Sequence, residues 1–298
     1  MTAHDSATLI ATSDFRSGTV PAALGVVSFS LTFPATVWAL DGFGPWTATG
    51  VRGLLAGLLA ALCLRLARVP LPARAHWPAL LTVAGGCVVG FPLLTTLALR
   101  TSGTAHSAVV IGLLPLATAV ISSALTGRRP SRAFWAAAGA GALAVLAFTL
   151  GQSGGVPTVG DLCLFGALLV CAAGYAQGGR LTAHMPGWQV IAWGVVAAFP
   201  VSALVTALAL PVEPVRLTGR AVAGMAYAAA VSQFGGFVVW YRGMGVIGVP
   251  RASQLQLAQP LLTLGWAVLL LGEDLSPLAP VTALVVLACI AVTQRARA

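Results

Sequence analysis

The stretch from Gly236 to Asp274 reads GFVVWYRGMGVIGVPRASQLQLAQPLLTLGWAVLLLGED, two apolar segments joined at a turn near Pro250. The second segment carries polar residues and a proline before it becomes uniformly apolar: Gln254, Gln256, Gln259 and Pro260. Amides and a proline in an apolar helix are costly in a lipid bilayer unless they face a partner or a water-filled cavity. This stretch therefore predicts a membrane helix that contributes polar groups to a protein interior.

The same plan occurs once more, in residues 91–129, FPLLTTLALRTSGTAHSAVVIGLLPLATAVISSALTGRR. A shift of 145 residues places Gly103 on Gly248, Pro115 on Pro260 and Gly127 on Gly272. The residues that follow are Arg128-Arg129 in one copy and Glu273-Asp274 in the other. Because positive charge stays on the cytoplasmic side, this reversal indicates two copies inserted in opposite directions. A chance resemblance of two apolar hairpins is the alternative.

The composition places the chain in a bilayer. Of its 298 residues, 58% are hydrophobic and 8% are charged, whereas a soluble domain carries about 25% charged residues. All sixteen Lys and Arg residues are arginine, and they lie in short loops between apolar segments. They form no basic patch with interleaved aromatic residues, so we expect no nucleic-acid partner; membrane lipid surrounds the protein.

The predicted fold is an all-α integral membrane protein with ten transmembrane helices, arranged as a 5+5 inverted repeat around a central cavity. The predicted parts are a tail at 1–17, a first repeat at 18–152 and a second repeat at 153–298. The apolar segments are 20–40, 46–66, 77–98, 104–126, 133–150, 160–181, 188–210, 220–241, 251–271 and 277–294.

The arginines also predict the orientation. With the N-terminus in the cytoplasm, twelve of the sixteen arginines fall on the inner side, and five of the seven acids fall outside. We therefore expect a multi-pass protein of the plasma (inner) membrane with both termini cytoplasmic. The five cysteines lie within apolar segments and form no CxxC motif or Cys/His cluster, so no metal and no cofactor is expected.

The order and spacing of several features resemble the EamA-type branch of the drug/metabolite transporter superfamily. The features are Gly160-Asp161 opening the second half, Arg52 in the second span, Pro115 and Pro260 in equivalent helices, and Leu271-Gly272-Glu273. The resemblance covers residues 18–295 and implies alternating-access transport of small metabolites; several members export amino acids. The arginine pair at 128–129 departs from the acidic or mixed end that is usual in the first-half copy.

Charged candidates in the spans are few. Arg52 could bind a substrate carboxylate through its fork of donors, or it could tie a neighbouring helix. His106 could titrate near neutral pH, or be a solvated histidine at the outer turn. No acid lies in the middle of a span, so cationic drug export through a membrane glutamate, as in the small multidrug exporters of this superfamily, is disfavoured.

The glutamines are the strongest site prediction. Gln256, Gln259 and Thr263 share one helix face beside Pro260, which frees a backbone carbonyl. Interhelical hydrogen bonding is the alternative role. The full set of predicted cavity residues is Gln256, Gln259, Thr263, Gln233, Tyr175, Thr95, Thr96, His106, Arg52 and Ser30, with helix breaks at Pro115, Pro260 and Pro34.

These observations predict a secondary transporter, monomeric, that exports amino acids or similar small metabolites through a cavity lined by spans three, four, eight and nine, with help from one and six. Uptake, or transport of nucleosides or sugar-like compounds, remains open. An intramembrane enzyme is the alternative from another class, but His106 and Ser107 are adjacent and point apart on a helix. No phosphate-binding GxxxxGK[ST] loop is present, which argues against direct use of ATP.

Overall fold

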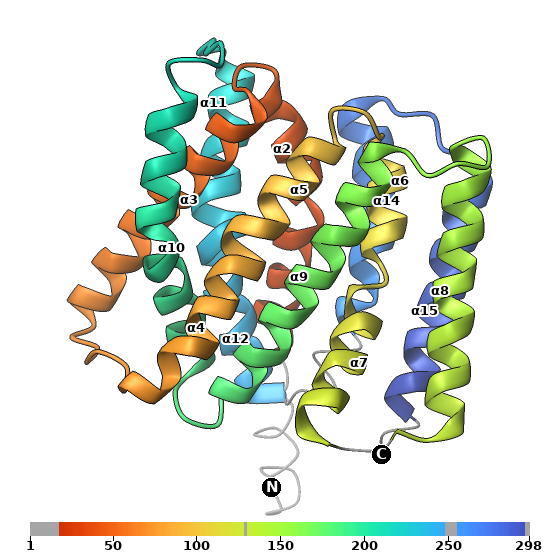
Figure 1. Cartoon of the computed structure of the whole chain (residues 1–298), viewed down its shortest axis with the longest axis horizontal. Helices are drawn as coiled ribbons and strands as arrows, with labels where there is room; N and C mark the ends of the chain where they lie inside the picture. The colour runs from red at the N-terminus through yellow and green to blue at the C-terminus, as the bar shows by residue number, and fades with distance from the viewer. Residues whose placement is uncertain (1–17, 128–129, 248–254, 296–298) are drawn as a thin grey trace, which may run out of the picture.

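The computed structural model describes residues 18–127, 130–247 and 255–295, and these form a bundle of helices (Figure 1). In the described residues there is no strand beyond one isolated bridge between Phe43 and Val215. Eight helices in this part of the chain are long and apolar enough to cross a membrane, and two shorter apolar helices, Ala258–Leu271 and Leu278–Thr293, follow them. The helices follow the predicted apolar segments, except in the ninth, 251–271, where the uninterrupted helix begins at Ala258 and residues 251–254 lie outside the described residues.

The helices of the first half are α2 (Thr32–Leu40, continuing the helical residues from Gly18), α3 (Pro45–Leu66), α4 (Trp77–Val83), α5 (Phe91–Ala98), α6 (Thr104–Ile111), α7 (Leu114–Thr126) and α8 (Arg132–Gln152). Those of the second half are α9 (Val159–Leu181), α10 (Gly187–Ala209), α11 (Gly219–Ala226), α12 (Gly236–Ile247), α14 (Ala258–Leu271) and α15 (Leu278–Arg295). Helix α3 packs along α10, and α8 along α15, so the two halves interlock.

Each half contains a π-helical segment at an equivalent place. Segment η2 (Ala84–Gly90) joins α4 to α5, and η3 (Tyr227–Gly235) joins α11 to α12. The two composite helices run in opposite directions: α4 lies at the lower end of Figure 1 and α5 above it, whereas α11 lies at the top and α12 below it. A π-helical turn widens the backbone and frees carbonyl groups, and such turns are frequent at functional sites.

Two glycines that the 145-residue shift aligns, Gly127 and Gly272, end their helices in the same way. Gly127 follows α7 with φ of 65°, and Gly272 follows α14 with φ of 67°. Both are left-handed caps, a conformation that glycine adopts without a steric penalty. The third landmark of the alignment, Gly248, lies outside the described residues.

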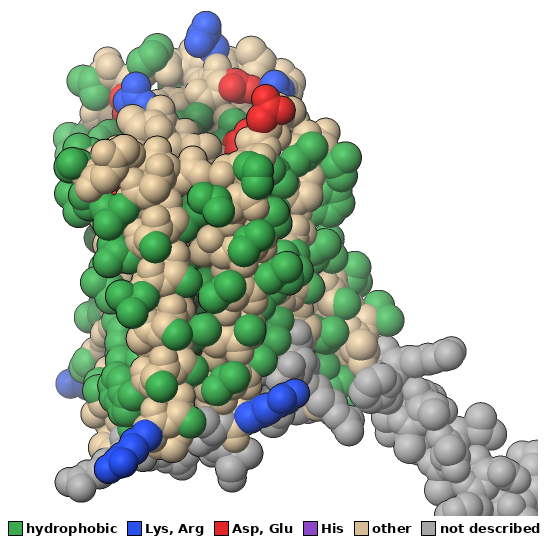
Figure 2. Space-filling model, turned by 90° about the vertical axis from the view of Figure 1, so that its right-hand side faces the viewer, with side chains coloured by type: hydrophobic (Ala, Val, Ile, Leu, Met, Phe, Trp, Pro, Cys, Tyr) green, Lys and Arg blue, Asp and Glu red, His purple; other side chains and the backbone are tan. Residues whose placement is uncertain are grey.

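Charged side chains gather at the two ends of the bundle, whereas its flank is apolar. Figure 2 shows one flank covered by hydrophobic side chains, with acidic side chains only at the upper end. Large apolar residues are exposed along the helices, for example Leu143 at 67% and Leu284 at 56%. Water would penalise this surface, so it is a surface made for lipid.

Four buried apolar clusters in the described residues hold the halves together, and two of them are large. One is built mainly on α6, α8, α9 and α15, and the other on α3, α4, α10 and the π-helical turns. Both clusters include residues from each half of the chain, and the cavity described below lies between them.

Candidate functional site

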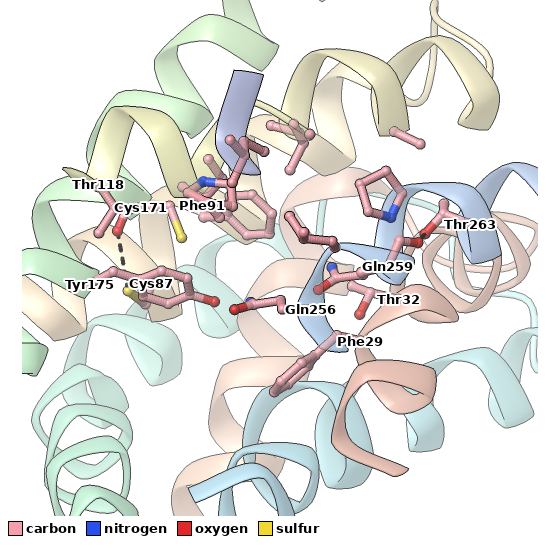
Figure 3. Close-up of a pocket in the computed structure, with 18 of the residues that line it drawn as sticks. Phe29, Thr32, Cys87, Phe91, Thr118, Cys171, Tyr175, Gln256, Gln259 and Thr263 are labelled. Carbon is pink, nitrogen blue, oxygen red and sulfur yellow. Dashed lines mark hydrogen bonds between the residues drawn. The ribbon is translucent and has the colours of Figure 1, made fainter. Parts of the chain in front are cut away.

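A cavity of about 520 Å³ lies between the two halves of the chain (Figure 3). Residues of α2, α6, α7, α9, α12 and α14, of both π-helical turns, and of the segment before α14 line it. Arg52 of α3, a predicted cavity residue, also lines it, although the second span was not among the spans expected to form the cavity. Residues of α15 line it as well, and the sequence did not predict a contribution from this tenth apolar segment. The volume suits a single small metabolite.

The predicted glutamine face is part of this cavity. Gln256 and Gln259 both line it, as does Thr263. In Figure 3, Gln256 and Tyr175 project toward one another from opposite walls. The hydroxyl of Thr263 lies 3.0 Å from the carbonyl oxygens of Gln259 and Ser30, so it links α14 to the first helix. Gln254 lies outside the described residues.

The helical backbone is interrupted shortly before both prolines of the repeat. Pro115 and Pro260 line the cavity, and each comes shortly after a helix break, at Gly112-Leu113 and at Leu257. Proline donates no backbone hydrogen bond, so the carbonyl four residues earlier is released. Such carbonyls are tolerated at membrane depth where they line a protein cavity.

The π-helical turns bring polar atoms from both halves to the same wall. The amide nitrogen of Gln233 in η3 donates to the carbonyl oxygen of Cys87 in η2 at 3.4 Å. Gln233 is 2% exposed, and its carbonyl oxygen has no hydrogen-bond partner among the described residues. Cys87 and Ser232 line the cavity but were not predicted to do so. The 145-residue shift places Cys87 on Ser232, and this equivalence is a signal that could have identified them.

Arg52 is the buried charge of the cavity. It is 6% exposed, and its Nη2 donates to Ser232 Oγ at 3.1 Å. Ser232 in turn shares a hydrogen bond of 2.7 Å with Thr32, so α3, η3 and α2 are connected. The ion pairs of the described residues do not include Arg52, and its Nε is buried without a hydrogen-bond partner there.

The structure places five of the predicted residues outside the cavity lining: Thr95, Thr96, Ser30, Pro34 and His106. Thr95 donates to the carbonyl of Phe91 within its own helix, and the hydroxyl of Ser30 accepts from Trp266 at 2.9 Å. Composition cannot reveal the rotation of a helix about its axis, and these side chains lie on faces that pack against neighbouring helices.

His106 is engaged with Asp161 at the upper end of the bundle. Its Nε2 lies 2.7 Å from Asp161 Oδ1, and its ring stacks on Phe148. The other carboxylate oxygen accepts from Ser153 Oγ at 2.7 Å and from the backbone and hydroxyl of Thr158 at 2.8 and 2.9 Å. The alternative of a merely solvated histidine is therefore wrong. Asp161, 1% exposed, completes the capping box of α9 with Thr158 and also bonds to His106.

The cavity opens toward the lower end of the bundle. The exposed residues of its lining, Gly179 and Arg180, belong to the last turns of α9. The lining residues nearest the upper end, such as Phe33 and Ala108, are buried. The described lining contains two arginines, Arg52 and Arg180, and no aspartate, glutamate or histidine.

No cluster of three or more His, Cys, Asp or Glu residues suited to a metal ion occurs in the part of the chain that the structure describes. The cavity wall instead offers amides, hydroxyls, a guanidinium and aromatic rings. Such groups can form hydrogen bonds and apolar contacts with a solute, and the described lining contains no aspartate, glutamate or histidine that could act as a base.

Comparison with known proteins agrees with this geometry. The model of the EamA-like transporter family matches the chain twice, at residues 16–150 and 158–294. The chain is 38% identical over 279 residues to the uncharacterized transporter YdeK of Bacillus subtilis (strain 168), covering 94% of this chain and 97% of that protein. A solved protein, described only as a crystal structure, shares the fold with a TM-score of 0.64 at 21% identity, over 95% of this chain and 99% of that one. These matches confirm the resemblance drawn from the sequence: the chain belongs to the EamA-like transporter family, in two repeats of the family's domain.

Proposed function

We propose that this protein is a secondary transporter that exports amino acids or similar small metabolites across the plasma (inner) membrane by alternating access. The observation that carries the proposal is the cavity between the two halves, open at one end of the bundle and closed at the other. A solute that enters from the open end is separated from the opposite end by packed helices. Transport then requires the halves to rock about the site.

The membrane arrangement proposed is ten spans in two inverted repeats, with both termini cytoplasmic. The arginine-rich lower end then faces the cytoplasm, in keeping with the positive-inside rule. The open mouth of the cavity, beside Arg180, faces the same side. This is the side from which an exporter loads its substrate.

The chemistry of the wall supports a small polar solute with an apolar part. Gln256 and Gln259 offer both amide donors and carbonyl acceptors. Three aromatic rings lie together beside them: Phe237 is 4.6 Å from Phe29 and 6.3 Å from Tyr175, measured between ring centroids. An amino acid with an apolar side chain has groups for both surfaces.

We propose no ion coupling through a cavity carboxylate, because none of the described lining residues is acidic. The protein then acts as a facilitator, and the substrate gradient sets the direction of net flux. Uptake in place of export follows from the same mechanism when that gradient is reversed. Nucleosides or sugar-like solutes are the alternative substrates, since amides bind hydroxyl-rich solutes as well.

An intramembrane hydrolase is the alternative from another class, and the geometry does not favour it. Ser153 and His106 bond to different carboxylate oxygens of Asp161. The Ser153 hydroxyl therefore donates to the carboxylate and not to the imidazole that would have to activate it. Ser107 donates to the carbonyl oxygen of Gly103 within its own helix. A nucleophile has to lie within hydrogen-bond reach of its base.

The test is counterflow in liposomes that contain the purified protein. Vesicles loaded with an unlabelled solute accumulate the same radiolabelled solute only if a carrier exchanges the two. A panel of amino acids, nucleosides and sugars ranks the substrate classes, and protein-free liposomes give the background. Exchange of amino acids supports the proposal; exchange of nucleosides or sugars alone supports the alternative, and no exchange for any solute contradicts both.

A further inference from the structure

We infer that the cavity selects solutes with a net negative charge, and that Arg52 binds their carboxylate group. This inference rests on the proposed transport function and places the preferred solutes among the metabolites similar to amino acids, ahead of the zwitterionic amino acids themselves. It assigns Arg52 a role in substrate specificity, in addition to connecting helices through its hydrogen bond to Ser232. Amino-acid-derived acids without a free ammonium group are the solutes that fit it.

The charge of Arg52 has no counter-charge in the described structure. Arg52 lies within α3, away from both ends of a helix that is apolar enough to cross the membrane. A guanidinium stays protonated in proteins, so burial does not neutralise it. Charged groups inside a membrane protein are expensive, and they mark substrate pathways where they line a cavity.

The guanidinium is held at the cavity wall with binding capacity left over. One of its nitrogens donates to Ser232, which itself bonds to Thr32, and this connection fixes its position. Its Nε remains buried and without a partner among the described residues. A planar carboxylate matches the fork of a guanidinium and forms charge-assisted hydrogen bonds with it.

The described lining offers no protein carboxylate that could pair with Arg52 in place of a solute carboxylate. None of the described lining residues is acidic, so a bound ammonium group would find only neutral acceptors such as the amides of Gln256 and Gln259. Arg180 adds a second positive charge near the mouth and attracts anions into the cavity. The expected order of affinity is therefore anion, then zwitterion, then cation.

The aromatic rings of the cavity indicate that the part of the solute other than its carboxylate is apolar. Phe29, Phe237 and Tyr175 form a connected group of rings, and all three line the same cavity as Arg52. A carboxylate on Arg52 leaves the remainder of the solute in contact with apolar walls. A monocarboxylate with an aromatic or aliphatic body suits this combination better than a polyanion.

The test uses three probes of matched shape: 3-phenylpropanoate (anion), phenylalanine (zwitterion) and 2-phenylethylamine (cation). Calorimetry with the purified full-length protein in detergent measures the affinity for each. We expect the anion to bind the wild type at least about tenfold more tightly than the cation, since charge-assisted pairs are the strong ones. In Arg52→Gln this ratio falls to near one, and Arg52→Lys keeps part of it because the charge remains.

Arg65→Gln is the matched control, since Arg65 is an exposed arginine on the same helix that does not line the cavity. It should leave the ratio unchanged. If Arg52→Gln does not fold, the wild-type order and Arg52→Lys still decide the matter. An equal or reversed order in the wild type overturns the inference, as does a ratio that Arg52→Gln leaves intact.

Counterflow of amino acids separates the two claims. If amino acids exchange without any preference for anionic solutes, the proposed function stands and the charge selectivity is wrong. If no solute exchanges and no probe binds, the proposed function itself fails.

Discussion

The carboxylate of Glu273 accepts the backbone N–H of Thr104 at 2.7 Å, so the end of α14 in the second half holds the start of α6 in the first. Its second oxygen accepts the N–H of Ala105 at 2.9 Å. Glu213 does the same for α3, accepting from Trp46 and Thr47 at 3.3 and 2.7 Å. Both glutamates therefore join the halves at the end where the cavity is closed.

Replacing Glu273 with glutamine should lower the free energy of unfolding by about 1–2 kcal/mol. The amide keeps one acceptor, but it loses the second and the negative charge that favours a helix N-terminus. Thermal unfolding in detergent measures the change. Asp274→Asn is the control, because Asp274 is an exposed acid beside it, and its effect should be small. Equal losses in the two variants would show that Glu273 contributes nothing beyond its charge.

Replacing Gln256 or Gln259 with leucine should impair transport of the solute that counterflow identifies, by about tenfold or more for each. Leucine keeps the bulk but removes the amide groups that face the cavity, and a lost hydrogen bond to a buried polar solute is costly. Both variants should remain monodisperse in detergent. Normal transport with a loss of stability of about 0.6 kcal/mol per bond would instead assign the glutamines to helix contacts.

Replacing His106 with asparagine should leave transport nearly unchanged, and nearly independent of pH between about pH 6 and 8. The imidazole lies outside the cavity and bonds to Asp161, which keeps its bonds from Ser153 and Thr158. Counterflow at several pH values makes the measurement. A steep pH dependence in the wild type that the variant loses would make His106 the coupling site.

Replacing Asp161 with asparagine tests how much the hydrogen bonds of this carboxylate contribute to stability, separately from the contribution of His106. Its carboxylate accepts from Ser153, Thr158 and His106, and asparagine cannot satisfy all of these donors. We expect a loss of about 1–3 kcal/mol in the free energy of unfolding, because buried donors are left without acceptors. Thermal unfolding should therefore distinguish it from His106→Asn, whose loss is expected to be smaller. The reverse order would mean that stacking of His106 on Phe148 matters more than the cap of α9.

Gly86 and Gly85 offer a matched pair within η2. A methyl group on Gly86 would overlap the backbone carbonyl of Val170 in α9, whereas one on Gly85 meets nothing within 4 Å. Gly86→Ala should therefore cost about 1–3 kcal/mol through overpacking, and Gly85→Ala should be neutral or slightly stabilising. Thermal unfolding compares them. A similar loss in both would show that the backbone, not the helix contact, requires glycine in this turn.

Cysteines at the two ends of the bundle test the membrane orientation. Leu71 and Val156 are exposed at 76% and 70%, in loops at the lower and upper ends. In a variant without native cysteines, Val156→Cys should react with an impermeant thiol reagent in whole cells, and Leu71→Cys only after lysis. The opposite pattern would overturn the orientation that the arginines predict.

The sequence alone determined where the helices lie and that the plan occurs twice. Apolar length sets a membrane helix, and glycine and proline mark breaks through their own backbone geometry, so these signals are local. The shared left-handed caps at Gly127 and Gly272 follow from residue identity at fixed spacing. The face formed by Gln256, Gln259 and Thr263 was predictable for the same reason, since helical spacing fixes which residues share a side.

Only the tertiary structure decided which face of each helix meets the cavity and which partners the buried polar groups find. Thr95 and Ser30 were as polar as Thr32, yet only Thr32 lines the cavity. The bond from Arg52 to Ser232 joins residues 180 positions apart, and that of His106 to Asp161 joins separate helices. Such pairs depend on the rotation and packing of helices that are far apart in the chain, and apolar sequence leaves both undetermined because every face of a membrane helix is nearly equally hydrophobic.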